Sequence, residues 1–555
     1  MAYFLILLCA FLFFIFQTYR YRKDAEKEKR RKIDKAWGNT PDRTYTYEEL
    51  DCISKYYQLK EEEKFQIDDI TWNDLDMDRV FSLINNSNSS VGDEFLYYWL
   101  RTPENDFEEL KKRDKLITFF EKNPEKAKIL SFLFSKLGRT KKGSVYENLR
   151  NLENVGKRSN LIHYLHLGLL ILSLVSFLVN SALGIGLLVL TVAYNVIDYY
   201  RKKAEVDTYF ICIRYILALV ETSKELSKID IKELEEYQKE LRKYTEPLKK
   251  LESGRTIVGA SVGSGDLSEI FLDYIRILTH IDLIKINSIL GLAIEKQREV
   301  EKLFECIGRI EASISIASFR TMLPYYCRLD YQKGSRILAE EIYHPLISNA
   351  VANNFDEERV VLLTGSNASG KSTFLKTIAM NAILGQTIFT VTAKTYQSDL
   401  YQVYSSMALH DNLEENESYY IVEIKSLKRI IDAVAKQKNI LCFVDEVLRG
   451  TNTVERIAAS SRILKDMADH KIKVFAATHD IELTHILEND FANYHFQEEV
   501  KDQDVIFDYS LRKGRATSRN AIKLLGMMGY DKNLIKSAED SANKFLETGT
   551  WEIIE

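Results

Sequence analysis

Proline, paired cysteines and an excess of one charge are all scarce in this chain. Only 6 of its 555 residues are proline, so little in the sequence interrupts helices, and Lys/Glu/Leu-rich stretches favour a helix-dominated protein. With no C-x-x-C pair, the cysteines suit a reducing environment and argue against a structural zinc site. The net charge of -5 gives no support for nucleic-acid binding by charge alone. The cysteines are Cys9, Cys52, Cys212, Cys306, Cys327 and Cys442.

The N-terminal segment lacks the pattern of a cleaved secretory signal. Residues 2–16 are almost wholly apolar, and the basic cluster follows them at 20–32 instead of preceding them. Under the positive-inside rule, this order predicts an uncleaved transmembrane anchor over residues 1–19, with the rest of the chain cytoplasmic. A buried N-terminal helix is the alternative.

A second apolar region covers residues 161–198 and has basic residues on both flanks. Two spans joined by a tight turn near Asn180 would return the chain to the same side, as those flanks require. Each half is short against the roughly 20 residues of a full span, so a buried soluble hairpin is the alternative. We expect three spans in all, a multi-pass protein of the cell membrane, and residues 336–515 in the cytoplasm.

The remaining sequence predicts an α plus α/β protein. Residues 20–80 are polar and mixed, which indicates a basic juxtamembrane linker. Residues 81–335 show apolar positions at helical spacing and form a helical domain interrupted by the hairpin. From 336 to 515, short β-rich runs alternate with helices, which is typical of a domain with a parallel sheet. Residues 516–555 form a C-terminal segment.

The strongest motif is G-x-x-x-x-G-K-S-T at 365–373. It follows the apolar run Val360–Leu363 and precedes a helix-like segment, as a phosphate-binding loop (P-loop) requires. The loop backbone would hold ATP phosphates, Lys371 would reach the β- and γ-phosphates, and the Ser372 hydroxyl would bind Mg²⁺. The predicted nucleotide-binding residues are Gly365, Ser366, Asn367, Ala368, Ser369, Gly370, Lys371, Ser372 and Thr373.

Two further apolar runs end in candidate catalytic residues. Residues 439–444 lead into Asp445 and Glu446, and residues 474–477 lead into Thr478 and His479. In a parallel sheet both ends meet at the ligand-binding edge. Asp445 would complete the Mg²⁺ site, Glu446 would orient or deprotonate the attacking water, and His479 would sense the γ-phosphate. His344 and His485 lack such a context and are interpreted as structural.

Several of these motifs resemble the MutS family of ABC-type ATPases. The loop at 365–373 is similar to G-P-N-M-S-G-K-S-T, the segment 445–453 to D-E-I-G-R-G-T-S-T, and 477–479 to A-T-H. The segment 411–424 resembles the family's signature loop. Residues 521–526 with 534–538 resemble its C-terminal helix-turn-helix, and residues 89–103 the start of its helical core or lever domain.

The resemblance implies an ATP- and Mg²⁺-dependent homodimer in which Ser418 reaches the γ-phosphate held by the other subunit. It also implies that residues 516–555 help to clasp the dimer and that the helical arms hold double-stranded DNA.

Departures from the family pattern are equally clear: no mismatch-reading domain is expected, and Asn416 replaces a glycine of the signature loop. A membrane-tethered switch acting on a protein or lipid partner is therefore the alternative to a DNA-bound ATPase. A transport ATPase is disfavoured because the chain has no L-S-G-G-Q-like motif.

Overall fold

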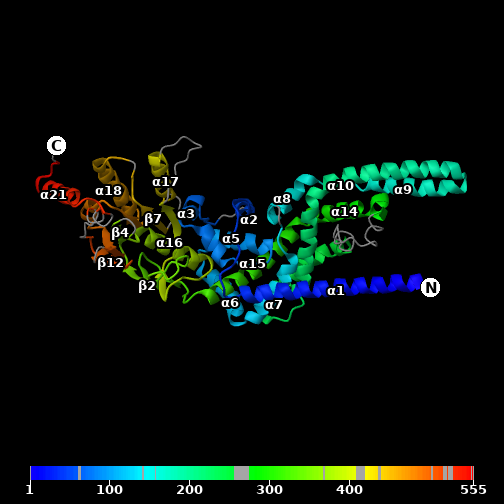
Figure 1. Ribbon diagram of the computed structural model, residues 1–555, viewed down its shortest axis with the longest axis horizontal. Coiled ribbons are helices and arrows are strands. Elements are labelled where there is room, and N and C mark those ends of the chain that lie inside the picture. The colour runs from blue at the N-terminus through cyan, green and yellow to red at the C-terminus, as the bar shows by residue number, and fades with distance from the viewer. Residues whose placement is uncertain are drawn as a thin grey trace. The chain divides into compact units, whose positions relative to one another are not determined.

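The chain divides into two compact units, which are treated separately below. Unit 1 comprises Met1–Glu61, Ile84–Tyr98 and Lys115–Met322, and unit 2 comprises Glu62–Leu83, Trp99–Asp114 and Leu323–Glu555 (Figure 1). The computed structural model describes residues 2–555 except 61–63, 141–142, 157, 255–273, 367–368, 408–418, 435–438, 450, 502–503, 517–521, 523–524, 526–528, 552 and 554–555.

Unit 1 is helical throughout its described part. The long helix α15 is buried along most of its length and forms the centre of this unit's core. The helices are α1 (Ala2–Ala36), α2 (Tyr47–Leu59), α7 (Pro124–Leu137), α8 (Val145–Val155), α9 (Leu161–Val175), α10 (Ser181–Leu226), α11 (Glu235–Thr245), α14 (Ile281–Glu295) and α15 (Gln297–Met322), with parts of α4 (Met77–Ile84), α5 (Ser90–Arg101) and α6 (Phe107–Lys122).

A buried carboxylate fixes the start of α5 within unit 1. Glu311 on α15 accepts hydrogen bonds from the backbone N–H groups of Asn88, at 2.5 Å, and Ser89, at 3.0 Å. It therefore satisfies donors that a helix N-terminus leaves free. A Cβ at Gly92 would lie 2.5 Å from the Glu311 carboxyl group, so only glycine allows this approach. Burial raises the pKa of Glu311 to about 7, against the effect of these hydrogen bonds.

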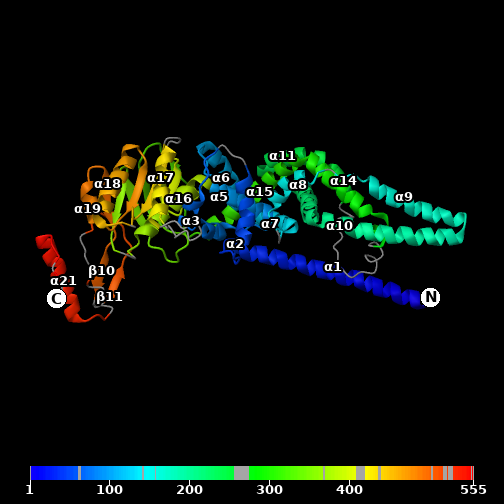
Figure 2. The same ribbon diagram turned by 90° about the horizontal axis from the view of Figure 1, so that it is seen from above.

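The predicted apolar hairpin is present as two helices lying side by side, α9 and the first half of α10 (Figure 2). The short 3₁₀ helix η1 (Ser176–Leu178) and Asn180 join them, and the Asn180 side chain caps the start of α10. Within the described residues, two segments are long and apolar enough to cross a membrane, Leu161–Leu178 and Ser181–Lys203, each only 17% buried. The other expected span, the N-terminal anchor at residues 1–19, falls in α1. The side chains of residues 2–12 are not among those that the structure describes.

Helix α10 does not stop at the expected end of the hairpin. It continues for 46 residues to Leu226, through the basic residues 201–203, as one helix. The exposed apolar half of α10 is thus continuous with a half whose Ile213, Ile216 and Leu219 are buried in the core of unit 1. The hairpin was expected to end at residue 198, and the uninterrupted helical pattern of both halves explains why the helix continues beyond it.

Unit 2 is built on a six-stranded sheet with the order β12-β9-β4-β8-β7-β6, in which all neighbours but β12 and β9 run parallel. The mixed α/β expectation is thereby confirmed. The strands are β4 (Val360–Thr364), β6 (Gln402–Ser406), β7 (Ile440–Asp445), β8 (Lys473–Ala477), β9 (Phe491–His495) and β12 (Arg512–Lys513). A second sheet has the order β1-β5-β2-β3, with β1 (Asp330–Tyr331), β2 (Ile337–Ile342), β3 (Asn353–Glu357) and β5 (Thr395–Ser398). A two-stranded ribbon pairs β10 (Glu498–Lys501) with β11 (Asp504–Phe507).

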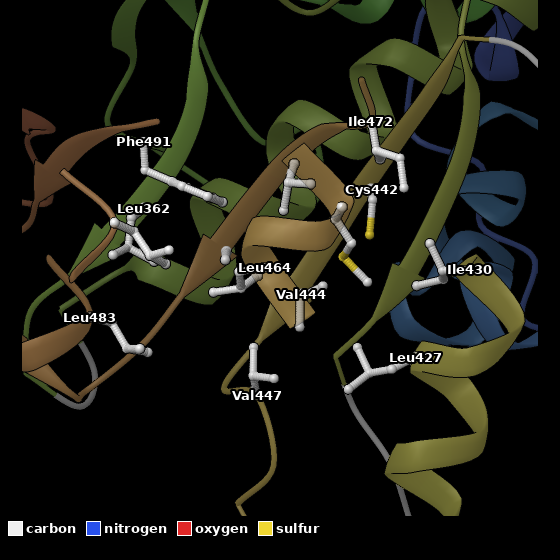
Figure 3. Packing of buried hydrophobic residues seen from close by; sticks show 14 of the residues in the cluster. Leu362, Leu427, Ile430, Cys442, Val444, Val447, Leu464, Ile472, Leu483 and Phe491 are labelled. Atoms are coloured by element: carbon white, nitrogen blue, oxygen red, sulfur yellow. The ribbon is translucent and has the colours of Figure 1, made fainter. Parts of the chain in front are cut away.

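One face of the main sheet packs on three helices: α17 (Tyr419–Val434), α18 (Thr453–Asp469) and α19 (Ile481–Ile486). Figure 3 shows Leu427 and Ile430 of α17 and Leu464 of α18 against strand residues such as Cys442 and Val444. Helix α16 (Lys371–Thr387) contacts β6, β7 and β8 separately from this cluster. Successive residues of a strand face opposite sides of the sheet. Because helices cover both sides here, the central strands are apolar at nearly every position.

Helix α3 (Asp69–Asp74) covers the edge strand β6 in unit 2. Asp74 accepts hydrogen bonds from the Ser405 hydroxyl at 2.7 Å and from the Met407 backbone N–H at 2.9 Å. The segment 20–80, expected as a linker, is therefore distributed differently: its first part is helical in unit 1, and residues 64–80 belong to unit 2, where α3 packs on the edge of the sheet. An exposed strand edge needs such a cover, but sequence does not reveal which segment supplies it.

The C-terminal segment of unit 2 contains one described helix, α21 (Lys532–Thr548), ended by Gly549 in a left-handed conformation. Most of residues 517–528 lie outside the described residues, so the predicted helix-turn-helix stays a prediction.

Candidate nucleotide-binding site

The loop after β4 is shaped by its two motif glycines. Gly365 and Gly370 have φ values of 143° and 109°, which favour glycine. A Cβ at Gly365 would stand 2.7 Å from the carbonyl oxygen of Phe496, so this position is closed to other residues on steric grounds as well. Gly370 ends the loop, and helix α16 begins at Lys371 with its N-terminus at the loop.

The Lys371 side chain forms hydrogen bonds with the backbone of the loop. Its ammonium group donates to the carbonyl oxygens of Gly365 and Ser366, both at 2.8 Å, and lies 3.5 Å from His479 Nε2. Burial lowers the pKa of Lys371, while the nearby Asp445 and Glu446 oppose that shift. The amine is thus placed at the loop mouth, where it can exchange carbonyl oxygens for phosphate oxygens.

Three parallel strands bring the candidate catalytic groups together. Strand β8 lies between β4 and β7, and both Leu363 and Asp445 pair with Ala477 in register. The chain beyond each strand therefore emerges at one edge: the P-loop after β4, Thr478–His479 after β8, and Glu446 after β7. The structure brings together Lys371, Glu446 and His479 as the sequence predicts, with His479 Nε2 3.0 Å from Glu446 Oε1.

Cationic partners hold Glu446 in its ionised form. Burial alone would raise its pKa, but hydrogen bonds from His479 and from Arg449 outweigh burial and lower the pKa of Glu446 to about 2. Glu446 also adopts a left-handed backbone, with φ of 58°, which is unusual for a residue other than glycine. Such strain is commonly stored at functional sites. In this state each oxygen of Glu446 accepts one hydrogen bond and keeps a second acceptor site that could orient a water molecule.

Asp445 and Ser372 fit the role of Mg²⁺ ligands. Asp445 Oδ1 is buried and has no hydrogen-bond partner among the described residues. Ser372 is exposed in the first turn of α16. Carboxylate and hydroxyl oxygens of this kind are the donors that Mg²⁺ uses together with phosphate oxygens and water. When bound, the ion would neutralise phosphate charge.

Two supports of the site were not predicted as such. Glu423 on α17 is buried and accepts backbone hydrogen bonds from Leu448 and Arg449, which fixes the chain just after Glu446. Arg456 on α18 makes two hydrogen bonds to Asp480, at 2.9 and 2.6 Å, next to His479. Glu423 lies in the segment that resembles the signature loop, which is the only sequence signal for its role.

An apolar cavity of about 340 Å³ opens beside Gly370 and Thr373 within unit 2. Its aromatic lining residues are Tyr343, His344, Phe374, Phe496 and Tyr509. His344, interpreted from sequence as structural, therefore faces a cavity next to the phosphate loop. Burial lowers the pKa of His344 to about 4, so its ring is neutral at pH 7. A pocket of this kind suits a flat, largely apolar ring system.

Three predicted site residues cannot be placed. Asn367 and Ala368 of the loop and Ser418 of the signature segment lie outside the described residues. Their predicted roles, and the trans contact of Ser418 with a second subunit, stay predictions.

A P-loop between a central parallel strand and a helix, with carboxylates at a nearby strand end, defines this unit as a P-loop nucleotide-binding domain. Comparison with known proteins refines that class, because residues 361–546 match MutS domain V. Over residues 361–546, about a third of its length, the chain is therefore similar to a domain of the MutS family.

Related proteins are similar over the same region. The chain is 28% identical over 271 residues to a DNA mismatch repair protein MutS of Caldicellulosiruptor saccharolyticus, covering 46% of this chain and 31% of that protein. It is 28% identical to MutS of Bacillus subtilis, covering 40% and 27%, and 26% identical to the mismatch repair protein MSH3 of Candida albicans, covering 42% and 24%. The matched part thus spans about a third or less of each relative. Proteins of this family are in general ATPases that use ATP and Mg²⁺.

Proposed function

We propose that this chain is a membrane-anchored MutS-type ATPase that binds ATP at a homodimer interface and uses hydrolysis to move its helical arms on DNA. The observation that carries the ATPase part is the cluster Lys371–His479–Glu446 at the ends of neighbouring strands, with 3.5 and 3.0 Å between successive groups. Phosphoryl transfer needs little covalent participation by protein, so positioned charges of this kind suffice for catalysis.

In the proposed cycle, the adenine ring enters the cavity lined by Tyr343, His344 and Phe374, and the phosphates reach the loop. Lys371 turns from the loop carbonyls to the β- and γ-phosphates. His479 then turns from Glu446 toward the γ-phosphate, which frees one carboxylate oxygen of Glu446 to orient water. Ser418 of the partner subunit would close the site.

The test is the Glu446→Gln variant of the full chain. Loss of a positioned base slows hydrolysis by about 10²–10³-fold, while ATP binding persists and a dimer accumulates with ATP. The steady-state ATPase rate, nucleotide binding and size-exclusion chromatography measure these three properties. Glu482→Gln, an exposed acid three residues beyond His479, is the matched control and should hydrolyse ATP at the wild-type rate. A Glu446→Gln rate equal to wild type would reject the assignment.

Membrane anchoring is proposed from the hairpin. Its exposed side chains are largely apolar, including Leu165, Leu169, Leu172, Val189 and Leu190, and such a surface is costly in water. We expect the full chain to resist alkaline extraction from membranes and its ATPase domain to be digested by protease added to the cytoplasmic side. Release by alkali, or a protected ATPase domain, would reject this topology.

The DNA part of the proposal rests on the family relationship and needs its own experiment. We expect duplex DNA to stimulate ATP hydrolysis by the full chain at low salt, and the stimulation to fade as salt rises. Robust hydrolysis that is indifferent to DNA would instead favour a switch acting on a protein or lipid partner.

A further inference from the structure

The apolar hairpin of unit 1 encloses a polar cluster that the nucleotide site does not use. His163 and His166 come from α9, Asp198 comes from α10, and His280 directly precedes α14. All four are buried, although most side chains around them on α9 and α10 are exposed and apolar. The chain has only 9 histidines, so finding three of them in one cluster indicates a specific purpose. Ionisable residues within candidate membrane spans are expensive and usually functional.

The hydrogen bonds of His166 fix which of its nitrogens carries a lone pair. The Asn195 side-chain N–H donates to the carbonyl of Leu278 at 2.9 Å, so the Asn195 Oδ1 atom accepts from His166 Nδ1–H at 2.8 Å. His166 Nε2 is then the unprotonated nitrogen of the neutral ring. This tautomer follows from the orientation of the asparagine amide.

His166 Nε2 faces Asp198 Oδ2 at 3.0 Å, yet neither atom has a hydrogen-bond partner within the described part of the chain. Both atoms are buried, and their relative orientation does not form an N–H···O bond. Two buried acceptor atoms at this distance, each without a hydrogen-bond donor, repel each other unless a cation lies beside them.

His280 presents a third lone pair. Its Nε2–H donates to the backbone carbonyl of Asn195 at 3.0 Å, so Nδ1 is the unprotonated nitrogen and accepts a hydrogen bond from His163 Nδ1–H at 3.0 Å. A metal ion bound at His280 Nδ1 would replace that hydrogen bond. His280 adopts a left-handed backbone, with φ of 55°, at the break before α14. One ligand atom from each of His166, Asp198 and His280 lies within 4.8 Å of the others.

We propose that His166, Asp198 and His280 bind a divalent transition-metal ion of the Zn²⁺ type. Metal–ligand distances of about 2.1 Å place tetrahedral ligand atoms about 3.4 Å apart, so the observed spacings require only small side-chain shifts. The N–H groups of the His166 and His280 rings both donate to Asn195. Hydrogen bonds of this kind, to the ring nitrogen that does not bind the metal, orient histidine ligands in metal sites. The absence of paired cysteines excluded one kind of zinc site, and this cluster is built from histidine and aspartate instead.

The ion would tie three helices together. α9, α10 and α14 each contribute a ligand or adjoin one, and the positive ion compensates the buried Asp198 carboxylate. This site is separate from the Mg²⁺ site proposed at Ser372 and Asp445, because it uses nitrogen ligands and belongs to unit 1.

The experiment uses the full chain in detergent micelles, stripped with a chelator and titrated with Co²⁺ in the presence of excess Mg²⁺. We expect one tightly bound Co²⁺ per chain with the visible absorption of nitrogen and oxygen ligation, and its displacement by Zn²⁺. Asp198→Asn and His166→Gln should each weaken binding by about 100-fold or more. His470→Gln, a change at the exposed histidine that directly follows α18, should leave binding unchanged.

Wild-type chain that binds no Co²⁺ and no Zn²⁺ would overturn the proposal without reference to any variant. An unchanged Co²⁺ spectrum in His166→Gln would overturn it as well. Should either variant misfold, the wild type still decides: chelation should lower its melting temperature and Zn²⁺ should restore it, whereas a melting temperature indifferent to both would reject the site. Because none of these readouts depends on ATP hydrolysis, failure here leaves the proposed ATPase standing.

Discussion

Two histidine–carboxylate pairs in this protein have the same separation and opposite surroundings. His479 and Glu446 at the nucleotide site, and His166 and Asp198 in the hairpin, each place nitrogen and oxygen 3.0 Å apart. The first pair is hydrogen-bonded and lies beside Arg449 and Lys371, with the His479 side chain 37% exposed. The second lacks a hydrogen bond, and its histidine is only 2% exposed.

The difference shows that distance alone does not assign a role. At the nucleotide site, positive groups already satisfy the carboxylate and must be displaced by a ligand that brings negative charge. In the hairpin, Asp198 Oδ2 has no hydrogen-bond partner among the described residues, and the component that we propose to be missing is a cation. The first arrangement suits an anionic ligand and the second a metal ion.

The largest effect is expected from Lys371→Ala, which removes the cation that faces the phosphates. Loss of a charge-assisted hydrogen bond should weaken ATP binding by about 10²-fold. Titration with a fluorescent nucleotide measures the change, and Co²⁺ binding by the same variant should match wild type if the two pairs are independent. Lys376→Ala, in the same helix, is the control because Lys376 pairs with Asp76 instead. Equal ATP affinity in both variants would contradict the role of Lys371.

Gly365→Ala tests the loop that positions these charges. The new Cβ would meet the Phe496 carbonyl oxygen at 2.7 Å, and alanine disfavours a φ of 143°. We expect a loss of about 1–3 kcal/mol in the stability of unit 2, read from thermal unfolding. Gly334→Ala is the matched control, since its φ is 138° but nothing lies within 4 Å of the added Cβ. A smaller loss in Gly365→Ala than in the control would show that the clash is relieved.

The low pKa of Glu446 predicts a pH-dependent stability. Its folded pKa of about 2 is below the ordinary glutamate pKa of 4.5, so its ion pairs stabilise the fold above pH 4.5 and lose effect as pH falls toward 2. The unfolding free energy of wild type relative to Glu446→Gln should then decrease by up to about 1.4 kcal/mol per pH unit below 4.5. Melting temperatures of both proteins from pH 7 to pH 3 test this. Parallel curves would mean that His479 and Arg449 do not hold the carboxylate as described.

The smallest effect is expected at the Arg456–Asp480 contact that supports His479. Arg456→Lys replaces a two-point hydrogen bond by a single one and should cost about 0.5–1 kcal/mol, measured as a lower melting temperature. Arg462→Lys, an exposed change on the same helix, should leave the melting temperature unchanged. A larger loss in the control would show that helix α18 responds to lysine in general.

Sequence predicted the parts of the site that are local in the chain. Each has a sequence pattern of its own: the loop at 365–373, the strand ending at Asp445 and the strand ending before His479. The three expected strands are present as β4, β7 and β8. Their adjacency followed from the rule that parallel strands share one ligand-binding edge.

What sequence could not predict depends on contacts between distant segments. Glu423 under the Glu446 turn, Asp74 covering β6, and His344 beside the loop are brought into place only by the fold. The hairpin cluster is a stronger example, because His166 and His280 are separated by 114 positions and share no motif. The proposed ligand atoms can be assigned only from the folded structure, where Asn195 accepts hydrogen bonds from both rings and so fixes the tautomers of His166 and His280.

Helix α10 has a mechanical consequence. Its 46 residues form a rod about 69 Å long, with one half in the exposed hairpin and the other packed in the core of unit 1. A tilt of about 5° at its core end would displace the hairpin end by about 6 Å, more than one helical turn. Small angular changes in the core of unit 1 are therefore magnified at the surface proposed to lie in lipid, so a membrane that holds the hairpin still would resist them.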